Sequence, residues 1–291
     1  MDCGISTACF YPEPLENTVD RIAALGVGVV EVFVNTESEF HPTFVRDMKA
    51  RLDAHGLRVA SVHPFTSPME GQLLLSNYDR RTQDGIAQYR NYFEAARVLG
   101  AHSLTFHGER SIIRDVDAAD TARKMDVYAA LCDVAAEYGI ALAQENVAWC
   151  KSESPDYIKR LYDEVPALRY TLDIKQAHRA GHHWSEYLDA MGERIINVHI
   201  NDFDETHSCM LPGEGVMQYD ALFDRLAALG YDEQVLIEVY DSDYESLEQI
   251  QRSLLFLDRC AAHRENCRSD FSFARENVTI EPQESTRQIV R

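Results

Sequence analysis

One unit recurs along this chain: an amphipathic helical segment, then a glycine, then an apolar run. The glycines at which it recurs are Gly26, Gly56, Gly100, Gly139 and Gly230. A glycine directly after a helix adopts the left-handed conformation that turns the chain back toward the next strand. Leu15, Val19 and Ile22, at three- and four-residue spacing, mark the helical segment before the first of these glycines. The pattern predicts helices that alternate with strands.

Eight apolar runs are the candidate strands. They cover residues 4–10, 29–34, 57–63, 102–107, 140–145, 169–173, 195–201 and 234–240. Most are continuously apolar, as parallel strands covered by helices are. Eight strand–helix units predict an α/β chain that closes into a (β/α)8 TIM barrel, with its active site at the carboxyl ends of the strands. The alternative is a doubly wound open sheet, but no GxGxxG motif follows the first run.

The domain organisation is expected to be one barrel followed by a short tail. A chain of 291 residues lies within the usual length of an α/β barrel. We predict the barrel over residues 1–262 and a polar C-terminal tail, outside the barrel, over residues 263–291. Phe271 and Phe273 in the tail favour docking on the barrel or on a neighbouring subunit. A homodimer and a homotetramer both stay open.

The charge balance argues against several classes of partner. The chain has 28 basic and 48 acidic residues, a net charge of -20, which would repel a nucleic acid backbone. No apolar run approaches the ~18 residues of a membrane span, and the first ten residues do not read as a secretory signal. The seven cysteines form no CxxC pair, which is typical of reduced thiols. We therefore expect a cytoplasmic protein with a small-molecule substrate.

The fifth to eighth apolar runs each end on or near a side chain that binds metals. These residues are Glu145, Asp173, His199 and Glu238. Each acid alone could cap a helix or pair with an arginine, but unpaired charges at four successive buried strands would be costly. The ends of adjacent barrel strands lie within reach of one ion. Three carboxylates and one imidazole suit a single divalent ion such as Mn²⁺, Mg²⁺, Co²⁺ or Zn²⁺.

Two histidines end the third and fourth runs, at the same predicted rim. His63 and His107 are candidates to contact substrate hydroxyl groups or to bind a second metal ion. The alternative for each is a histidine satisfied at the edge of the core. Glu109 follows shortly after and is a further candidate substrate contact, although it could equally orient His107 or lie in solvent. No GxSxG motif or other nucleophile motif appears.

A divalent ion with two glutamates nearby suits chemistry beside a carbonyl group. The ion would bind the carbonyl and a neighbouring hydroxyl of a sugar or polyol and stabilise the enediolate. One glutamate would remove the carbon-bound proton, and the other would return a proton. Return to the opposite face gives an epimerase, and return to the neighbouring carbon gives an isomerase. Loss of water would make the same site an inosose-type dehydratase.

Seven short segments, taken together and in order, resemble one known superfamily. They are SVH, HGE, QEN, TLDIKQA, VHIND, LPGEG and IEVY, and they are similar to the xylose-isomerase-like TIM barrels, a group of sugar isomerases and epimerases that includes endonuclease IV. The resemblance covers about residues 1–262. It implies that Glu145, Asp173, His199 and Glu238 bind the metal and that Glu145 and Glu238 are the catalytic acid and base.

Two departures from the superfamily pattern affect the expected substrate contacts. Many relatives carry a histidine three residues after the metal-binding aspartate, where this chain has Gln176, with Lys175 beside it. Both are therefore implied substrate contacts. Endonuclease IV needs an Asp-x-His pair before the glycine loop, where this chain has His207, Ser208 and Cys209. That difference disfavours a phosphodiesterase. A binding protein that keeps the barrel without catalysis is the remaining alternative.

Overall fold

The computed structural model describes residues 1–113, 115 and 117–276, with side chains through residue 262. Eight parallel strands form a closed barrel in chain order, with β1 paired to both β2 and β8. The strands are β1 (Asp2–Ser6), β2 (Val29–Val34), β3 (Arg58–Pro64), β4 (Ser103–Phe106), β5 (Ala141–Glu145), β6 (Arg169–Asp173), β7 (Ile195–Ile200) and β8 (Gln234–Ile237). The predicted TIM barrel is confirmed.

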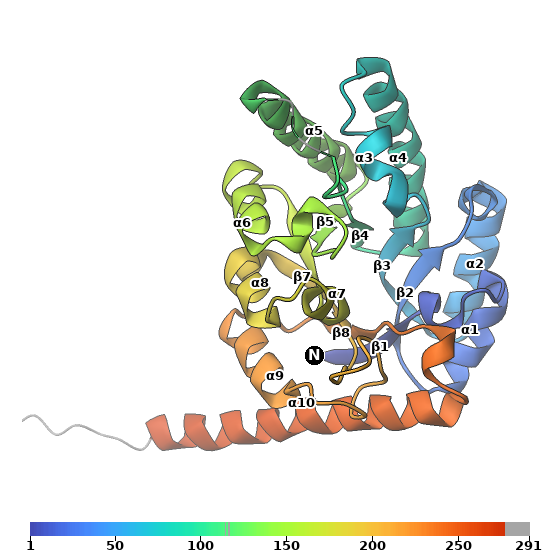
Figure 1. Cartoon of the computed structure of the whole chain (residues 1–291). Coiled ribbons are helices and arrows are strands. Elements are labelled where there is room, and N and C mark those ends of the chain that lie inside the picture. The colour runs from blue at the N-terminus through green and yellow to red at the C-terminus, as the bar shows by residue number, and fades with distance from the viewer. Residues whose placement is uncertain (114, 116, 277–291) are drawn as a thin grey trace, which may run out of the picture.

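Helices surround the barrel on its outer side, except the short α7, which lies near the centre of the barrel in the view of Figure 1. They are α1 (Leu15–Ala24), α2 (Pro42–Ala54), α3 (Glu70–Leu73), α4 (Asp79–Leu99), α5 (Ala118–Glu137), α6 (Pro155–Glu164), α7 (Ile174–Arg179), α8 (Trp184–Met191), α9 (Tyr219–Ala228) and α10 (Leu247–Glu276). Short 3-10 helices lie at Thr7–Phe10, Glu37–Phe40, Ser67–Met69, Lys151–Glu153, Gly192–Arg194 and Asp241–Asp243. The five glycines of the recurring unit all have positive φ, from 68° to 83°, as glycines at helix ends should.

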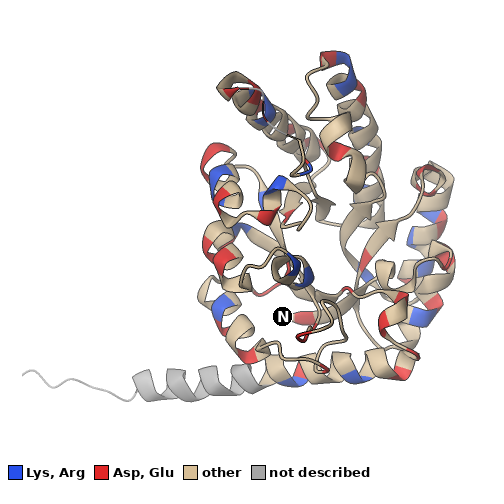
Figure 2. Ribbon diagram, in the orientation of Figure 1, with Lys and Arg blue, Asp and Glu red and all other residues tan. Residues whose placement is uncertain are grey.

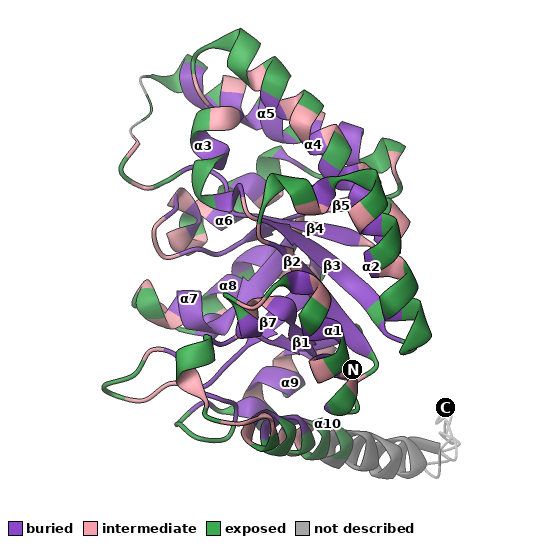
Figure 3. Cartoon of the chain, turned by 90° about the vertical axis from the view of Figure 1, so that its right-hand side faces the viewer, coloured by how far each residue is buried: buried purple, intermediate pink, exposed green. Residues whose placement is uncertain are grey.

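The core lies between the helices and the strands and continues inside the barrel. Figure 3 shows buried strands at the centre and exposed positions on the outward faces of the helices. Lysine, arginine, aspartate and glutamate residues are mixed along those outer faces (Figure 2). No helix in the described part of the chain is long and apolar enough to cross a membrane.

Strand β1 ends earlier than its apolar run predicts. The expected strand covered residues 4–10, but Thr7–Phe10 forms a 3-10 helix. The hydroxyl oxygen of Ser6 accepts a hydrogen bond from the backbone of Ala8 at 3.3 Å, which caps this helix. Cys9 and Phe10 are nevertheless buried. The prediction is wrong for residues 7–10 because apolar burial does not distinguish a strand from a short helix.

Helix α10 continues through the expected end of the barrel domain. It starts at Leu247 and runs to Glu276, so the predicted boundary after residue 262 falls within one helix. Its first turns are anchored on the barrel through Ile250, Leu254 and Leu257, all buried. The side chains of Phe271 and Phe273 and all of residues 277–291 lie outside the described part of the structure, so the docking of the tail stays a prediction.

Candidate active site

Four predicted metal ligands come together at the carboxyl ends of β5 to β8. Glu145 and Asp173 are the last residues of their strands, His199 is one residue from the end of β7, and Glu238 directly follows β8. Parallel pairing brings these ends side by side, with Asp173 in register with His199. One ligand atom from each of the four residues lies within 4.8 Å of the others.

The imidazole of His199 lies among the three carboxylates. Its Nδ1 atom is 3.5 Å from Glu238 Oε2, 3.7 Å from Asp173 Oδ2 and 3.9 Å from Glu145 Oε1. Ligands about 2.1 Å from one ion are expected to be about 3–4 Å apart. These separations therefore leave room for one ion among the four side chains.

Asp173 Oδ2 and His199 Nδ1 are among the atoms of this cluster that are buried without a hydrogen-bond partner in the described structure. Buried polar atoms of native proteins nearly always have a partner. Burial lowers the pKa of His199, but the carboxylates of Glu31 and Glu238 raise it well above its usual value. The surrounding charges therefore favour a cation at this place. The four residues fit a divalent metal ion.

A buried lysine stands beside the cluster. The ammonium group of Lys175 is 2.9 Å from Glu238 Oε2 and 3.7 Å from Asp173 Oδ2. Burial lowers the pKa of Lys175, whereas Glu238 and Asp173 raise it well above its usual value. Burial also raises the pKa of Glu238, but Lys175 and His199 outweigh this and bring it to about 2. Glu238 is therefore ionised.

A pair of histidines contacts Glu145 from the other side. His63 Nε2 and His107 Nε2 are 2.9 Å apart. Both face Glu145 Oε2, at 3.5 Å from His63 and 3.0 Å from His107. The ring of Phe33 stacks on His63, and that of Trp149 meets His107 edge-on. His63, His107 and Glu145 form a second group of side chains that could hold a metal ion. Both histidines also line the cavity at this end of the barrel.

A cavity of about 330 Å³ opens above these side chains. Polar and ionisable lining residues are His63, His107, Glu145, Lys175, Gln176 and Glu238, and the aromatic ones include Phe33, Trp149 and Tyr240. Both glutamates predicted to transfer protons therefore face the same cavity. Asp173 and His199 are absent from this lining and lie beneath it, 1% exposed each.

Gln176 has a structural contact in addition to its place in the cavity. Its side-chain oxygen accepts a hydrogen bond from the backbone of Ala148 at 3.2 Å. Its own backbone N–H donates to Asp173 Oδ1 at 2.8 Å, which caps the start of α7. Gln176 thus links the loop after β5 to Asp173, one of the predicted metal ligands.

Glu109 takes a different place from the predicted one. Its carboxylate accepts hydrogen bonds from Lys124 at 2.9 and 3.0 Å and pairs with Lys151 at 2.7 Å. Asp115 pairs with both lysines in the same cluster. Glu109 is absent from the lining of the active-site cavity; it is buried and pairs with the two lysines instead. Its role as a substrate contact is a prediction that this geometry does not support.

Sequence reasoning missed three residues around the site. Glu31 lies inside β2 and contacts His199 Nε2 at 3.0 Å; a carboxylate in the middle of the apolar run VVEVFV was the signal. Trp149 lines the cavity from the loop after β5. Glu70, on α3, accepts hydrogen bonds from the backbone of His107 at 2.7 Å and of Gly108 at 2.6 Å. No sequence pattern marks Trp149 or Glu70.

The family comparison agrees with this architecture. The model of the xylose isomerase-like TIM barrel family matches residues 19–260. The chain belongs to this family. An inosose isomerase of Bacillus velezensis is 22% identical over 222 residues, which cover 71% of this chain and 77% of that protein.

Solved structures show the same family fold. D-psicose 3-epimerase from Clostridium cellulolyticum H10, determined with D-tagatose, superposes with a TM-score of 0.75 at 16% identity and covers 90% of this chain and 99% of that chain. The IolI protein with a bound zinc atom gives a TM-score of 0.73 at 17% identity over 90% of this chain and 99% of that chain. At these identities the likeness establishes the fold of the family and leaves the substrate open.

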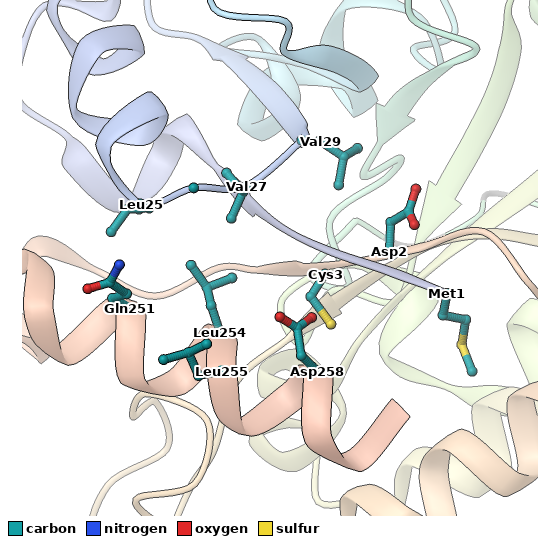
Figure 4. A pocket seen from close by; sticks show the side chains of 12 residues that line it. Met1, Asp2, Cys3, Leu25, Val27, Val29, Gln251, Leu254, Leu255 and Asp258 are labelled. Atoms are coloured by element: carbon teal, nitrogen blue, oxygen red, sulfur yellow. The ribbon is translucent and has the colours of Figure 1, made fainter. Parts of the chain in front are cut away.

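A second cavity lies at the opposite end of the barrel, where the strands begin (Figure 4). It has a volume of about 420 Å³ and lies between the start of β1, the loop before β2 and α10. Leu25, Val27 and Leu254 form part of its wall, and Cys3 and Asp258 point toward each other there. Burial raises the pKa of the Cys3 thiol, and Asp258 raises it further, so this thiol is a poor nucleophile.

Proposed function

We propose that this chain is a divalent-metal-dependent isomerase or epimerase of small sugars or cyclic polyols that carry a carbonyl group. One observation carries the proposal: the side chains of Glu145, Asp173, His199 and Glu238 converge at one place, and two of them, Glu145 and Glu238, line the cavity above it. Ionisable groups with shifted pKa values that converge on a cavity are typical of an active site. We propose Glu145, Asp173, His199 and Glu238 as the metal ligands.

The two glutamates are suited to move a proton. Several histidines hold the pKa of Glu145 well below its usual value against the raising effect of burial, and Glu238 is ionised as well, so either can accept a proton. They approach the cavity from β5 and β8, with β6 and β7 between them. One removes the proton beside the substrate carbonyl, and the other, after it has taken up a proton from solvent, donates that proton to the substrate. A bound divalent ion would supply stabilisation of the negative charge that develops on the carbonyl oxygen.

Other residues of the cavity are proposed to hold the substrate. His63 and His107 reach the cavity from β3 and the loop after β4 and can exchange hydrogen bonds with hydroxyl groups. Lys175 adds a positive charge close to Glu238, where it can stabilise a negatively charged oxygen. Gln176 offers its amide nitrogen, because its oxygen is already used by Ala148.

The cavity favours a small uncharged substrate. Its volume of about 330 Å³ is near the lower end for small-molecule sites, which suits a monosaccharide or cyclic polyol better than an oligosaccharide. Of the described residues in the lining, Lys175 is the one lysine or arginine, and it is already paired with Glu238. A sugar phosphate would need more positive charge. The inosose isomerase and D-psicose 3-epimerase among the similar proteins support this substrate class.

Solvent hydrogen exchange tests this proposal. The metal-loaded protein is incubated in D₂O with a panel of inososes, ketohexoses and ketopentoses, and proton NMR follows the hydrogen beside the carbonyl. We expect exchange with at least one substrate, and loss of that exchange in Glu145→Gln. Glu205→Gln, an exposed acid in the loop after β7, is the matched control and should exchange as the wild type does.

Two outcomes contradict the proposal. Absence of exchange across the whole panel, with metal bound, argues for a binding protein rather than an enzyme. An ultraviolet-absorbing enone or diketone product shows that water is lost, which makes the protein a dehydratase.

A further inference from the structure

The interior of the barrel contains a charged residue below the proposed metal site. Glu31 is fully buried inside β2. Its carboxylate accepts hydrogen bonds from side chains of β1, β3, β4 and β7: Ser6 at 3.1 Å, Ser61 at 2.6 Å, Thr105 at 3.3 Å and Asn197 at 3.3 Å. A buried carboxylate without such donors would be strongly destabilising. The interior of the barrel therefore provides hydrogen-bond donors that stabilise the negative charge of Glu31.

The same carboxylate reaches one of the proposed metal ligands. His199 Nε2 lies 3.0 Å from Glu31 Oε2, and because an ionised carboxylate only accepts hydrogen bonds, Nε2 carries the proton. The other ring nitrogen, Nδ1, then faces Glu238, Asp173 and Glu145. A neutral imidazole that donates from Nε2 has its lone pair on Nδ1. The ring is thereby fixed in the orientation that a metal ligand needs.

We propose that Glu31 is a positioning residue that holds His199 with Nε2 protonated and Nδ1 directed at the cation site. This inference rests on the metal site of the proposed function. Outer carboxylates that accept a hydrogen bond from a ligating histidine fix its orientation and increase its basicity, and their loss typically lowers metal affinity 10–100-fold. Glu31 is absent from the lining of the cavity, so it does not contact the substrate and reaches the proposed metal site through its hydrogen bond with His199.

Three variants separate this role from a purely structural one. Glu31→Ala removes the acceptor, whereas Glu31→Gln can keep an oxygen at the same place and turn its amide nitrogen toward Ser6. Ser61→Ala is the matched control, because it removes another partner of Glu31 at 2.6 Å without touching the hydrogen bond to His199. Circular dichroism checks that each variant is folded.

Calorimetric titration with Co²⁺ and the visible spectrum of the bound Co²⁺ are the first readouts. We expect Glu31→Ala to bind Co²⁺ about 10–100-fold more weakly than the wild type, with an altered spectrum. Glu31→Gln should lose less, and Ser61→Ala should stay within about threefold of the wild type. Wild-type affinity and spectrum in a folded Glu31→Ala protein overturn the proposal.

A second readout needs no metal and so separates this proposal from the proposed function. In the metal-free wild type, the ring proton on His199 Nε2 should give a slowly exchanging, strongly downfield NMR signal that Glu31→Gln shifts and Glu31→Ala removes. If the wild type binds no Co²⁺ but shows this behaviour, the proposed function fails and the positioning role stands. If Glu31→Ala does not fold, an unshifted signal in Glu31→Gln overturns the role.

Discussion

The two ends of the barrel both contain a cavity, and only one of them has the chemistry of an active site. The cavity at the amino ends of the strands is the larger, about 420 Å³ against about 330 Å³. Its wall combines leucine and valine side chains with two aspartates and a poorly reactive thiol. The smaller cavity has two histidines, two glutamates and a lysine in its lining. Size alone therefore does not identify the site, whereas convergence of ionisable groups does.

The largest effect is expected at the carboxyl end, from the removal of one proton-transfer group. Glu238→Gln keeps the shape of the side chain and removes its charge, so it should lower kcat by about 10²–10⁴-fold and also weaken metal binding. Steady-state kinetics with the substrate found by deuterium exchange measure the first effect, and Co²⁺ titration the second. A variant with wild-type kcat would remove Glu238 from the proposed pair.

Lys175→Met separates metal binding from catalysis at the same end. The ammonium group lies 2.9 Å from Glu238 Oε2, so it repels a cation bound by that carboxylate. Its removal should leave metal affinity unchanged or higher, while kcat falls about 10–100-fold because a charge that stabilises the substrate oxygen is lost. Parallel loss of metal and activity would instead make Lys175 a structural support of the ligands.

Glu70 predicts a pH dependence of stability at the carboxyl end. Burial raises the pKa of Glu70 from the usual value of about 4.3 to about 7, although His107 and Tyr89 lower it in part. The folded state therefore holds the proton of Glu70 more tightly than the unfolded chain does. Protonated Glu70 stabilises the folded state fully below about pH 4.3, and this stabilisation is lost as pH rises through 7.

Glu70→Gln should remove this dependence. Between pH 5 and pH 8 the wild type should lose up to about 3 kcal/mol of unfolding free energy relative to the variant. Urea unfolding of both proteins at the two pH values measures the difference. Parallel pH profiles for the two proteins would show that Glu70 titrates alike in the folded and unfolded chains.

The smallest effect is expected at the amino end. Leu255 borders the larger cavity and is 55% exposed. Leu255→Ser should change the unfolding free energy by less than about 0.5 kcal/mol, as surface substitutions usually do, and leave kcat and KM at wild-type values. A clear loss of activity would mean that the amino-end cavity takes part in function, and the contrast between the two ends would fail.

The sequence predicted the barrel and the convergence of the four proposed metal ligands because both follow from local patterns. Helix–glycine–strand units predict the topology, and the topology alone brings the ends of β5 to β8 together. The same patterns predict the ends of the strands less accurately than the topology: residues 7–10 form a 3-10 helix instead of a strand. Chain order determines which strands are neighbours, but hydrogen bonding at Ser6 determines where β1 stops.

The sequence patterns do not predict contacts between side chains that are far apart along the chain. Glu31 and His199 are 168 residues apart in the chain, and only the stagger of the strands inside the barrel brings them to the same level. Glu109 was expected at the cavity because it lies two residues after His107, but Lys124 and Lys151 pair with it instead. The partner of a charged loop residue depends on helices and loops elsewhere in the chain, which spacing along the sequence does not reveal.

The central claim is that the four residues at the ends of β5 to β8 hold one divalent ion. Calorimetric titration of the metal-free protein with Co²⁺ tests it, with Asp173→Asn as the decisive variant, because asparagine keeps an oxygen to accept the Gln176 N–H that caps α7. We predict one ion per chain for the wild type and at least tenfold weaker binding for the variant. No bound ion in the wild type, or equal affinity in a folded Asp173→Asn protein, would contradict the account.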